Sequence, residues 1–445
     1  MFCAGADISI IKSIKSEKDG EDLAKQGQEA FDLLESINCK KVAAISGPCV
    51  GGGCELVLAC DVRIISDHPS SMIGLPEVKL GILPGFGGTQ RLPRLIGIRK
   101  ALDIILAGKV VRSEQALKYG LVNQVVSYDQ LLEKAVKIAS GQQSYNAVSP
   151  SFVDKLIHYV CPVRNFIKKK SLDILNRKTK GFYPAPIAAL ESVFYGLEKG
   201  IKKGLDYEAK GIGKLIVTPE SKALIKTFFL TESSKSIGKS AKDKVKTFNG
   251  LVIGAGTMGA GIAGVMVKND CSVLLKDTKQ ESLDRGYKQI EKYINKIKYL
   301  DQTKKSVILN RVEKVLTDSN NIGTSNIVIE AIFENLDLKK RVLGDISKLV
   351  PQDCIIASNT SSLSITDIAE SIENPERVIG MHFFNPVEKM PLVEIIVGDK
   401  TSDKTIAIVA ALSTKLGKFP IVVRDVPGFL INRSLSPYLS EAAHL

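Results

Sequence analysis

A glycine-rich stretch in the second half of the chain has the spacing of a phosphate-binding loop. Residues 254–259 read Gly-Ala-Gly-Thr-Met-Gly, directly after an apolar run. In such a loop Gly254 would make a tight turn, Gly256 would let the backbone approach a pyrophosphate, and Gly259 would let a helix pack against a strand. Asp277 ends the next apolar run, where its carboxylate suits the ribose hydroxyls of NAD and would repel the extra phosphate of NADP. The pattern therefore predicts an NAD site, with a glycine loop that binds no ligand as the alternative.

A histidine and a glutamate lie twelve positions apart, each in or beside an apolar run. His382 follows the run 378–381, and Glu394 stands inside the run 392–396. A buried carboxylate needs a partner, and a histidine beside it gains the orientation and basicity that a catalytic base requires. The spacing alone is equally compatible with a structural His–Glu pair and with a catalytic dyad.

Two glutamates in the first part of the chain could form an acid/base pair. Glu55 follows three glycines at 51–53, where we expect a helix whose free N–H groups could stabilise an oxyanion. Glu77 follows in the segment 74–85. Two carboxylates near one oxyanion site suit general acid/base catalysis if their environments separate their pKa values. On spacing alone, a structural role for both residues remains the simpler interpretation.

Strand-like and helical patterns alternate on both sides of a charged middle segment. In the first part we expect strands at 42–45 and 62–65 and helices at 100–107 and 131–139. In the last part we expect strands at 251–253, 273–275, 327–330, 354–357, 377–380 and 392–396. This order predicts an α/β protein with a doubly wound parallel sheet from Thr247 to Val423.

Composition narrows the classes of function. The chain has 445 residues, more than one domain usually holds, and a hydrophobic fraction of 44%, which permits large cores. It lacks an apolar run of about 18 residues and an aromatic-studded basic stripe, so neither a membrane span nor nucleic-acid binding is expected. The net charge of +13 indicates a lysine-rich surface or attraction of polyanions such as acyl-CoA. Eight cysteines without a CxxC pair predict reduced thiols and no metal site.

The first part of the chain resembles the enoyl-CoA hydratase (crotonase) family. Three segments carry this resemblance: 2–7, 47–55 and 74–92. The resemblance implies that the N–H groups of Ala4 and Gly52 form an oxyanion hole for the thioester oxygen of an acyl-CoA. It also implies that Glu55 and Glu77 handle water and proton across the C2–C3 double bond. Relatives that shift double bonds make an isomerase the alternative for this half.

The last part resembles the 3-hydroxyacyl-CoA dehydrogenase family. Four segments carry this resemblance: 358–364, 381–386, 392–394 and 425–433. It implies that His382 removes the proton of the C3 hydroxyl while a hydride leaves C3 for the nicotinamide, and that Glu394 orients His382. Ser361 and Asn432 would hydrogen-bond the substrate. Further cofactor contacts are implied for Thr257, Met258, Glu334, Lys339 and Asn385.

The two resemblances together indicate a multifunctional enzyme of fatty acid β-oxidation, of the trifunctional α-subunit or bacterial oxidation-complex type. We expect a crotonase-like domain at 1–185 with its start missing, a helical linker at 186–246, a Rossmann-type domain at 247–426 and the beginning of a helical domain at 427–445. Both ends would then be cut from a longer protein, because strands and a CoA-binding segment that the family carries before its first motif are absent.

The resemblance also implies partners and a compartment. We expect acyl-CoA thioester substrates, a thiolase subunit as partner and an oligomer in the complete protein. The location would be the mitochondrial matrix, with the peroxisome as an alternative, in a eukaryote, and the cytoplasm in a bacterium. The competing hypothesis is an acyl-CoA and NAD-binding remnant with little catalysis, although the four acid/base residues argue against it.

Overall fold

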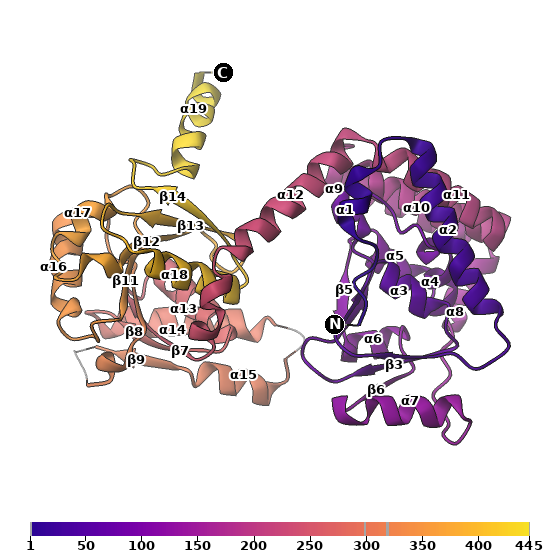
Figure 1. The fold of residues 1–445 in the computed structure, drawn as a ribbon, viewed down its shortest axis with the longest axis horizontal. Coiled ribbons are helices and arrows are strands. Elements are labelled where there is room, and N and C mark those ends of the chain that lie inside the picture. The colour runs from indigo at the N-terminus through magenta and orange to yellow at the C-terminus, as the bar shows by residue number, and fades with distance from the viewer. Residues whose placement is uncertain (1, 298–299, 317–319, 445) are drawn as a thin grey trace. The chain divides into compact units, whose positions relative to one another are not determined.

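The chain folds into two compact units (Figure 1). A computed structural model describes residues 2–297, 300–316 and 320–444. Unit 1 ends at Phe229 and unit 2 begins at Leu230, within the long helix α12 (Pro219–Ser236). Each unit has its own buried apolar core, so each is described by itself.

Unit 1 contains two small sheets surrounded by helices. Strands β1, β3 and β6 form a parallel sheet, and β2 pairs parallel with β4, which pairs antiparallel with β5. The elements are α1 (Ile8–Ser13), α2 (Glu17–Ser36), β1 (Val42–Ile45), β2 (Pro48–Val50), α3 (Gly52–Leu58), β3 (Val62–Ser66), β4 (Met72–Gly74), η1 (Glu77–Leu80), α4 (Gly88–Ile96), α5 (Ile98–Ile105), β5 (Val110–Arg112), α6 (Ser113–Tyr119), β6 (Gln124–Val126), η2 (Tyr128–Gln130), α7 (Leu131–Ala139), α8 (Phe152–Tyr159), α9 (Cys161–Thr179), α10 (Pro184–Lys199) and α11 (Ile201–Ile216).

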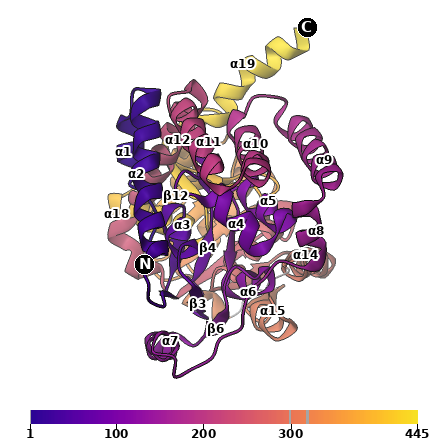
Figure 2. The ribbon, with the colours of Figure 1, turned by 90° about the vertical axis from the view of Figure 1, so that its right-hand side faces the viewer.

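Helices from distant parts of the sequence meet in unit 1. Helix α11 packs against α2 and α10, and both α10 and α11 contact α4 (Figure 2). The buried face of α11 repeats at helical spacing through Leu205, Glu208, Ala209 and Ile212, three apolar residues and one glutamate. The expected linker segment 186–246 therefore contributes two core helices to unit 1. The domain boundaries expected from the sequence remain predictions.

Unit 2 contains one eight-stranded sheet with helices on both faces. The elements are η3 (Lys239–Val245), β7 (Phe248–Ile253), α13 (Thr257–Lys268), β8 (Cys271–Lys276), α14 (Gln280–Asn295), α15 (Gln302–Leu309), β9 (Val312–Val315), η4 (Asn320–Thr324), β10 (Ile327–Glu330), α16 (Leu336–Ser347), β11 (Ile355–Ser358), α17 (Ile365–Ala369), η5 (Pro375–Arg377), β12 (Val378–Phe383), β13 (Leu392–Val397), α18 (Asp403–Lys415), β14 (Phe419–Arg424) and α19 (Ile431–His444).

The sheet of unit 2 has the order β14-β13-β12-β11-β10-β7-β8-β9 and is parallel except where β12 meets β13. Consecutive residues of β7 are buried in different cores, one on each face of the sheet. Val252 belongs to the core that includes residues of α13, α14 and α18, whereas Leu251 belongs to the core that includes residues of α16 and α17. A sheet buried on both faces explains why these strands are continuous apolar runs. The predicted doubly wound sheet is confirmed, with one antiparallel pair that the sequence did not reveal.

The polar end of the middle segment, which lies in the expected helical linker, is helical. Residues 232–236 belong to α12, and η3 follows it. Lys415 of α18 donates to the carbonyl oxygens of Val245 and Lys246 at 2.7 Å each, which fixes η3 onto α18. All eight cysteines lie in the described ranges and are free thiols. Among the described helices, none has the length and apolar character needed to cross a membrane.

Candidate active sites

The glycine loop of unit 2 joins β7 to α13 at the carboxyl edge of the sheet. Gly254 has φ +100°, a conformation that glycine adopts without strain. A methyl group built on Gly259 would lie 1.8 Å from the carbonyl oxygen of Gly254, so only glycine allows this approach of helix to loop. A methyl group on Gly256 would meet nothing within 4 Å, which leaves open space beside the N-terminus of α13. Space and free N–H groups at this point fit a dinucleotide pyrophosphate.

Asp277 lies at the end of β8 and is tied to the same loop. Its Oδ2 accepts a hydrogen bond from the Ala255 N–H at 2.8 Å, and its Oδ1 accepts one from the Lys279 N–H at 3.1 Å. The carboxylate therefore holds the first turn of the loop from the neighbouring strand. Its position after β8 is the one in which an acidic residue reaches the ribose of a bound dinucleotide.

His382 and Glu394 face each other across the antiparallel pair β12–β13. They are direct partners in the strand register, so their side chains share one face. His382 Nδ1 lies 2.8 Å from Glu394 Oε2, and both residues are buried. The other oxygen of Glu394 accepts the N–H groups of Leu430 and Ile431 at 3.0 and 2.9 Å. With Nδ1 held by the carboxylate, Nε2 is the ring nitrogen available to a substrate proton.

Glu334 joins the loop after β11 to the loop after β10. Its Oε1 accepts hydrogen bonds from Thr360 Oγ1 at 2.6 Å, Ser361 N at 2.8 Å and Ser361 Oγ at 3.1 Å. Burial alone would raise the pKa of Glu334, but these donors and the charge of Lys339 lower it overall. Asn432 Nδ2 donates to the Ser361 carbonyl oxygen at 3.1 Å, so Ser361 lies between Glu334 and Asn432.

Lys339 is one of the largest fully buried side chains of unit 2, with 1% exposure. Its ammonium group lies 2.6 Å from Glu330 Oε1 and 3.3 Å from Glu334 Oε2. Glu330 Oε2 accepts Ser358 Oγ at 2.6 Å, which completes the network. Lys339 therefore contacts Glu334 from the buried side, and its predicted place near the cofactor remains a prediction.

A cavity of about 340 Å³ is lined in part by five of the predicted dehydrogenase residues. Its lining comprises Met258, Ala331, Ile332, Glu334, Asn359, Ser361, His382, Phe383, Phe384 and Asn385. The glycine loop contributes Met258, β12 contributes His382, and the loop after β12 contributes Asn385. Six of the sequence-predicted residues thus meet at one edge of the sheet, counting Asn432 through its bond to Ser361.

In unit 1, the segment before α1 runs beside β2 and the start of α3. Cys3 forms a parallel bridge with Cys49, which places Ala4 next to the glycines that begin α3. A methyl group built on the neighbouring Gly5 would lie 2.8 Å from the Gly52 nitrogen. Within the described residues, the N–H groups of Ala4 and Gly52 donate to no other part of the chain. Two free N–H groups on neighbouring segments are the arrangement that an oxyanion needs.

Glu55 and Glu77 lie on either side of these glycines, in different hydrogen-bonding environments. Glu55 Oε1 accepts the N–H groups of Phe86 at 2.8 Å and Gly88 at 2.7 Å. Neither oxygen of Glu77 accepts a hydrogen bond from any described residue, although both are buried. A methyl group on Gly51 would lie 3.3 Å from Glu77 Oε1, so Glu77 borders the start of α3.

Burial gives these two carboxyl groups higher pKa values than those of exposed acids. Burial raises the pKa of Glu77 to about 8, and the charge of Glu208 adds to this effect. Burial and the charges of Glu77 and Glu208 also hold the pKa of Glu55 well above its usual range. The N–H groups of Gly88 and Phe86 oppose that shift, because they stabilise the anion. The two carboxyl groups therefore differ in their donors: two N–H groups stabilise the anion of Glu55, and no described residue donates to Glu77.

Two buried glutamates of these sites escaped the sequence reasoning. Glu208 of α11 accepts the N–H groups of Gly87 at 2.6 Å and Thr89 at 3.0 Å, and Glu330 anchors Lys339. Each carried a weak signal, because Glu208 occupies a core position of an amphipathic helix and Glu330 ends an apolar strand. Burial raises the pKa of Glu208 to about 7, against the effect of its donors.

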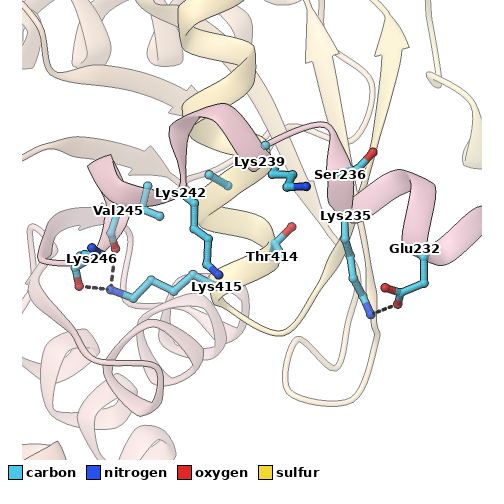
Figure 3. A pocket seen from close by; sticks show the side chains of 11 residues that line it. Glu232, Lys235, Ser236, Lys239, Lys242, Val245, Lys246, Thr414 and Lys415 are labelled. Carbon is cyan, nitrogen blue, oxygen red and sulfur yellow. Dashed lines mark hydrogen bonds and ion pairs between the residues drawn. The ribbon is translucent and has the colours of Figure 1, made fainter. Parts of the chain in front are cut away.

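A second cavity of unit 2, of about 570 Å³, lies between the end of α12, η3 and α18 (Figure 3). Five lysines line it: Lys235, Lys239, Lys242, Lys246 and Lys415. In Figure 3 the ammonium group of Lys235 points to Glu232, at 2.7 Å, and that of Lys415 points to the carbonyl oxygens that fix η3. The lysines do not converge on one point, and none of the predicted site residues lines this cavity.

Two protein families match the two units. Residues 1–157 match the enoyl-CoA hydratase/isomerase family, and residues 251–426 match the NAD-binding domain of 3-hydroxyacyl-CoA dehydrogenase. The chain therefore contains an enoyl-CoA hydratase-type domain and an NAD-binding dehydrogenase domain. The predicted family resemblances, fold class and cofactor are confirmed.

Curated relatives match along the whole chain. The fatty acid oxidation complex subunit alpha of Shewanella loihica is 44% identical, and the match covers 100% of this chain and 64% of the relative. The subunit alpha of Vibrio vulnificus is 43% identical, with 100% and 63% covered. This chain thus spans less than two thirds of the length of these relatives. Both are bacterial proteins, and nothing in the match supports the mitochondrial alternative.

A solved structure, the (S)-3-hydroxybutyryl-CoA dehydrogenase of Ralstonia eutropha, is 42% identical and has a TM-score of 0.42. The match covers 44% of this chain and 69% of that chain.

Proposed function

We propose that this chain, a homologue of the α subunits of bacterial fatty acid oxidation complexes, catalyses two consecutive steps of fatty acid β-oxidation. Unit 1 hydrates trans-2-enoyl-CoA to (S)-3-hydroxyacyl-CoA, and unit 2 oxidises this alcohol to 3-ketoacyl-CoA. The observation that carries the proposal is the presence of two complete acid/base pairs, Glu55 with Glu77 and His382 with Glu394, in domains of the two matching families. The product of the first pair is the substrate of the second.

In the hydration step, the N–H groups of Ala4 and Gly52 bind the thioester oxygen and stabilise the enolate that forms. Glu55 takes a proton from water while the water oxygen bonds to C3. Its Oε1 is held by two N–H groups, whereas Oε2 accepts no bond from the described residues and can face the water. Glu77, kept protonated by burial, gives its proton to C2. One water is consumed: its oxygen and one hydrogen form the new hydroxyl, its second hydrogen passes to Glu55, and the hydrogen that C2 gains comes from Glu77. A net proton transfer from Glu55 to Glu77 then restores the pair.

In the oxidation step, Nε2 of His382 accepts the proton of the C3 hydroxyl. Glu394 stabilises the imidazolium that forms, and its own position is fixed by the N–H groups of Leu430 and Ile431. Ser361 and Asn432 hold the substrate oxygen at the same cavity edge. When bound, NAD supplies the acceptor for the hydride that leaves C3. The loop residues Gly254, Gly256, Thr257, Met258 and Gly259, with Asp277, Glu334 and Asn385, would hold the cofactor.

We infer that the protein acts within a complex, as the name of its relatives indicates for them. The product, 3-ketoacyl-CoA, is the substrate class that a thiolase cleaves, so a thiolase subunit is the partner that fits. Since both relatives are bacterial, the bacterial cytoplasm is the location that fits the proposal.

Separate assays on one preparation test the two activities. Glu77→Gln should reduce hydration of 2-enoyl-CoA by about 10²–10⁴-fold and leave NADH formation from 3-hydroxyacyl-CoA unchanged. His382→Gln should do the reverse. If each activity survives its own substitution, the site assignments are wrong. If the wild type isomerises 3-enoyl-CoA in preference to hydrating 2-enoyl-CoA, unit 1 is an isomerase. If the wild type shows neither hydration nor NADH formation, the chain is a binding remnant.

A further inference from the structure

The segment 86–89, called the 86–89 loop below, leads into α4 and includes the first two residues of that helix. It divides its N–H groups between two buried glutamates in strict alternation. Phe86 and Gly88 donate to Glu55, at 2.8 and 2.7 Å. Gly87 and Thr89 donate to Glu208, at 2.6 and 3.0 Å. Glu55 comes from α3 and Glu208 from α11, so the four-residue loop is held from two sides by carboxylates far apart in the sequence.

We propose that Glu208 is a positioning residue of the hydration reaction, which aligns Glu55 by fixing the 86–89 loop between the two carboxylates. This inference rests on the proposed hydratase activity of unit 1. Glu208 does not touch the substrate in this scheme, because its oxygens are occupied by the loop and by Gln28. It acts through the backbone that holds the catalytic carboxylate.

The surroundings of Glu208 form a site built for a carboxylate. Its side chain has 0% exposure. Besides the two loop N–H groups, it accepts the Thr89 hydroxyl and, at 3.1 Å, the amide of Gln28. The same Gln28 amide donates to the carbonyl oxygens of Gly85 at 3.0 Å and Leu205 at 3.1 Å, which ties α2, the loop and α11 together. Packing of α11 alone does not require several hydrogen-bond donors around one buried acid. These donors satisfy the oxygens of a carboxylate.

The loop is coupled to both parts of the hydratase site. Glu55 Oε1 has its two donors only while Phe86 and Gly88 keep their places. A methyl group built on Gly52 would lie 3.1 Å from the Phe86 ring, so this ring packs against the start of α3, where the oxyanion hole lies. A shift of the loop would therefore misalign the base and the oxyanion hole together. Misplacement by about 1 Å costs on the order of 10²-fold in rate.

Glu208 also contributes charge to the site. The charged groups near it are the carboxylates of Glu55 and Glu77 and the guanidinium of Arg91, whose Nη1 donates to the Phe86 carbonyl oxygen at 3.0 Å. The negative charge of Glu208 raises the pKa of both Glu55 and Glu77. Removing that charge should move both limbs of the pH–rate profile to lower pH, a change that simple loosening of the helix would not produce.

The test compares Glu208→Gln with Glu208→Asp and with Asp206→Asn, a matched loss of one charge on the exposed face of the same helix. We expect Glu208→Gln to lower kcat for hydration about 10²-fold with little change in KM, because its amide nitrogen cannot accept a loop N–H. Its pH profile should shift to lower pH. Glu208→Asp should recover part of kcat, and Asp206→Asn should match the wild type. NADH formation by unit 2 is the internal control.

Hydrogen exchange of the peptide around 83–92 gives a readout independent of activity. The Gly87 and Thr89 amides should lose protection in Glu208→Gln and keep it in Asp206→Asn. An unchanged kcat and pH profile in Glu208→Gln, or equal loss of both activities with an unshifted profile, would overturn the proposal. If the wild type hydrates no enoyl-CoA, the proposed function is wrong. If hydrogen exchange of this peptide is also unchanged in Glu208→Gln, Glu208 does not fix the loop either.

Discussion

Glu77→Gln should make the stability of unit 1 less sensitive to alkaline pH. Glu77 has an ordinary pKa of 4.5 in the unfolded chain and about 8 in the folded protein, because its carboxyl group is buried and the charge of Glu208 adds to the effect of burial. Folding therefore favours the protonated form. The stability that this proton contributes is fully present below pH 4.5, falls as pH rises, and is lost above about pH 8. A glutamine of the same shape is uncharged throughout and lacks this dependence.

The size of the effect follows from the two pKa values. Between pH 4.5 and 8 the folded state holds one more proton than the unfolded state, so stability falls by about 1.4 kcal/mol per pH unit. From pH 6 to pH 9 the wild type should lose about 3 kcal/mol through this residue alone. For a unit of this size, that corresponds to a relative change in Tm of about 6 to 12 °C.

Thermal unfolding of unit 1, followed at pH 6 and pH 9 in the wild type and in Glu77→Gln, measures this difference. Glu29→Gln, which changes an exposed glutamate of α2, is the matched control and should behave like the wild type. Glu55 and Glu208 are present in all three proteins. Glu77→Gln also removes the charge that raises the pKa of Glu55, which adds to the expected difference in the same direction. An equal drop in Tm for the wild type and Glu77→Gln would refute the idea that Glu77 is held protonated by burial.

Two further substitutions test unit 2. Lys339→Met leaves Glu330 buried without its cation and should cost about 3 to 5 kcal/mol of unfolding free energy. Lys340→Met breaks the more exposed pair with Glu370 and should cost less than about 1 kcal/mol; equal costs in a denaturant titration would argue against the buried network. Asp277→Asn should raise the NADP-to-NAD ratio of kcat/KM at least about 10-fold, since the carboxylate no longer repels a 2′-phosphate. A ratio unchanged from the wild type would remove Asp277 from cofactor selection.

The sequence by itself determined those parts of the molecule whose partners are close along the chain. The β7–loop–α13–β8 motif follows from glycines at fixed spacing between apolar runs, because the local geometry of the turn or of helix packing requires each glycine. The order of strands and helices likewise predicted the doubly wound sheet. The His382–Glu394 pair was predicted from two apolar runs, but its geometry depends on an antiparallel register between β12 and β13 that a parallel-sheet pattern did not reveal.

Only the tertiary structure decided which distant side chains share a buried environment. Glu208 reaches Gly87 across 121 positions, and nothing local distinguishes it from other glutamates on amphipathic helices. The family pattern gave Lys339 a place near the cofactor, and only the packing of β10 and α16 revealed its buried partner Glu330. The strength of a charge interaction depends on burial and on the donors that converge on the group, and both arise only when separate elements pack together. The reacting pairs could therefore be predicted from the sequence, whereas the residues that hold them in place are known only from the packing of the folded chain.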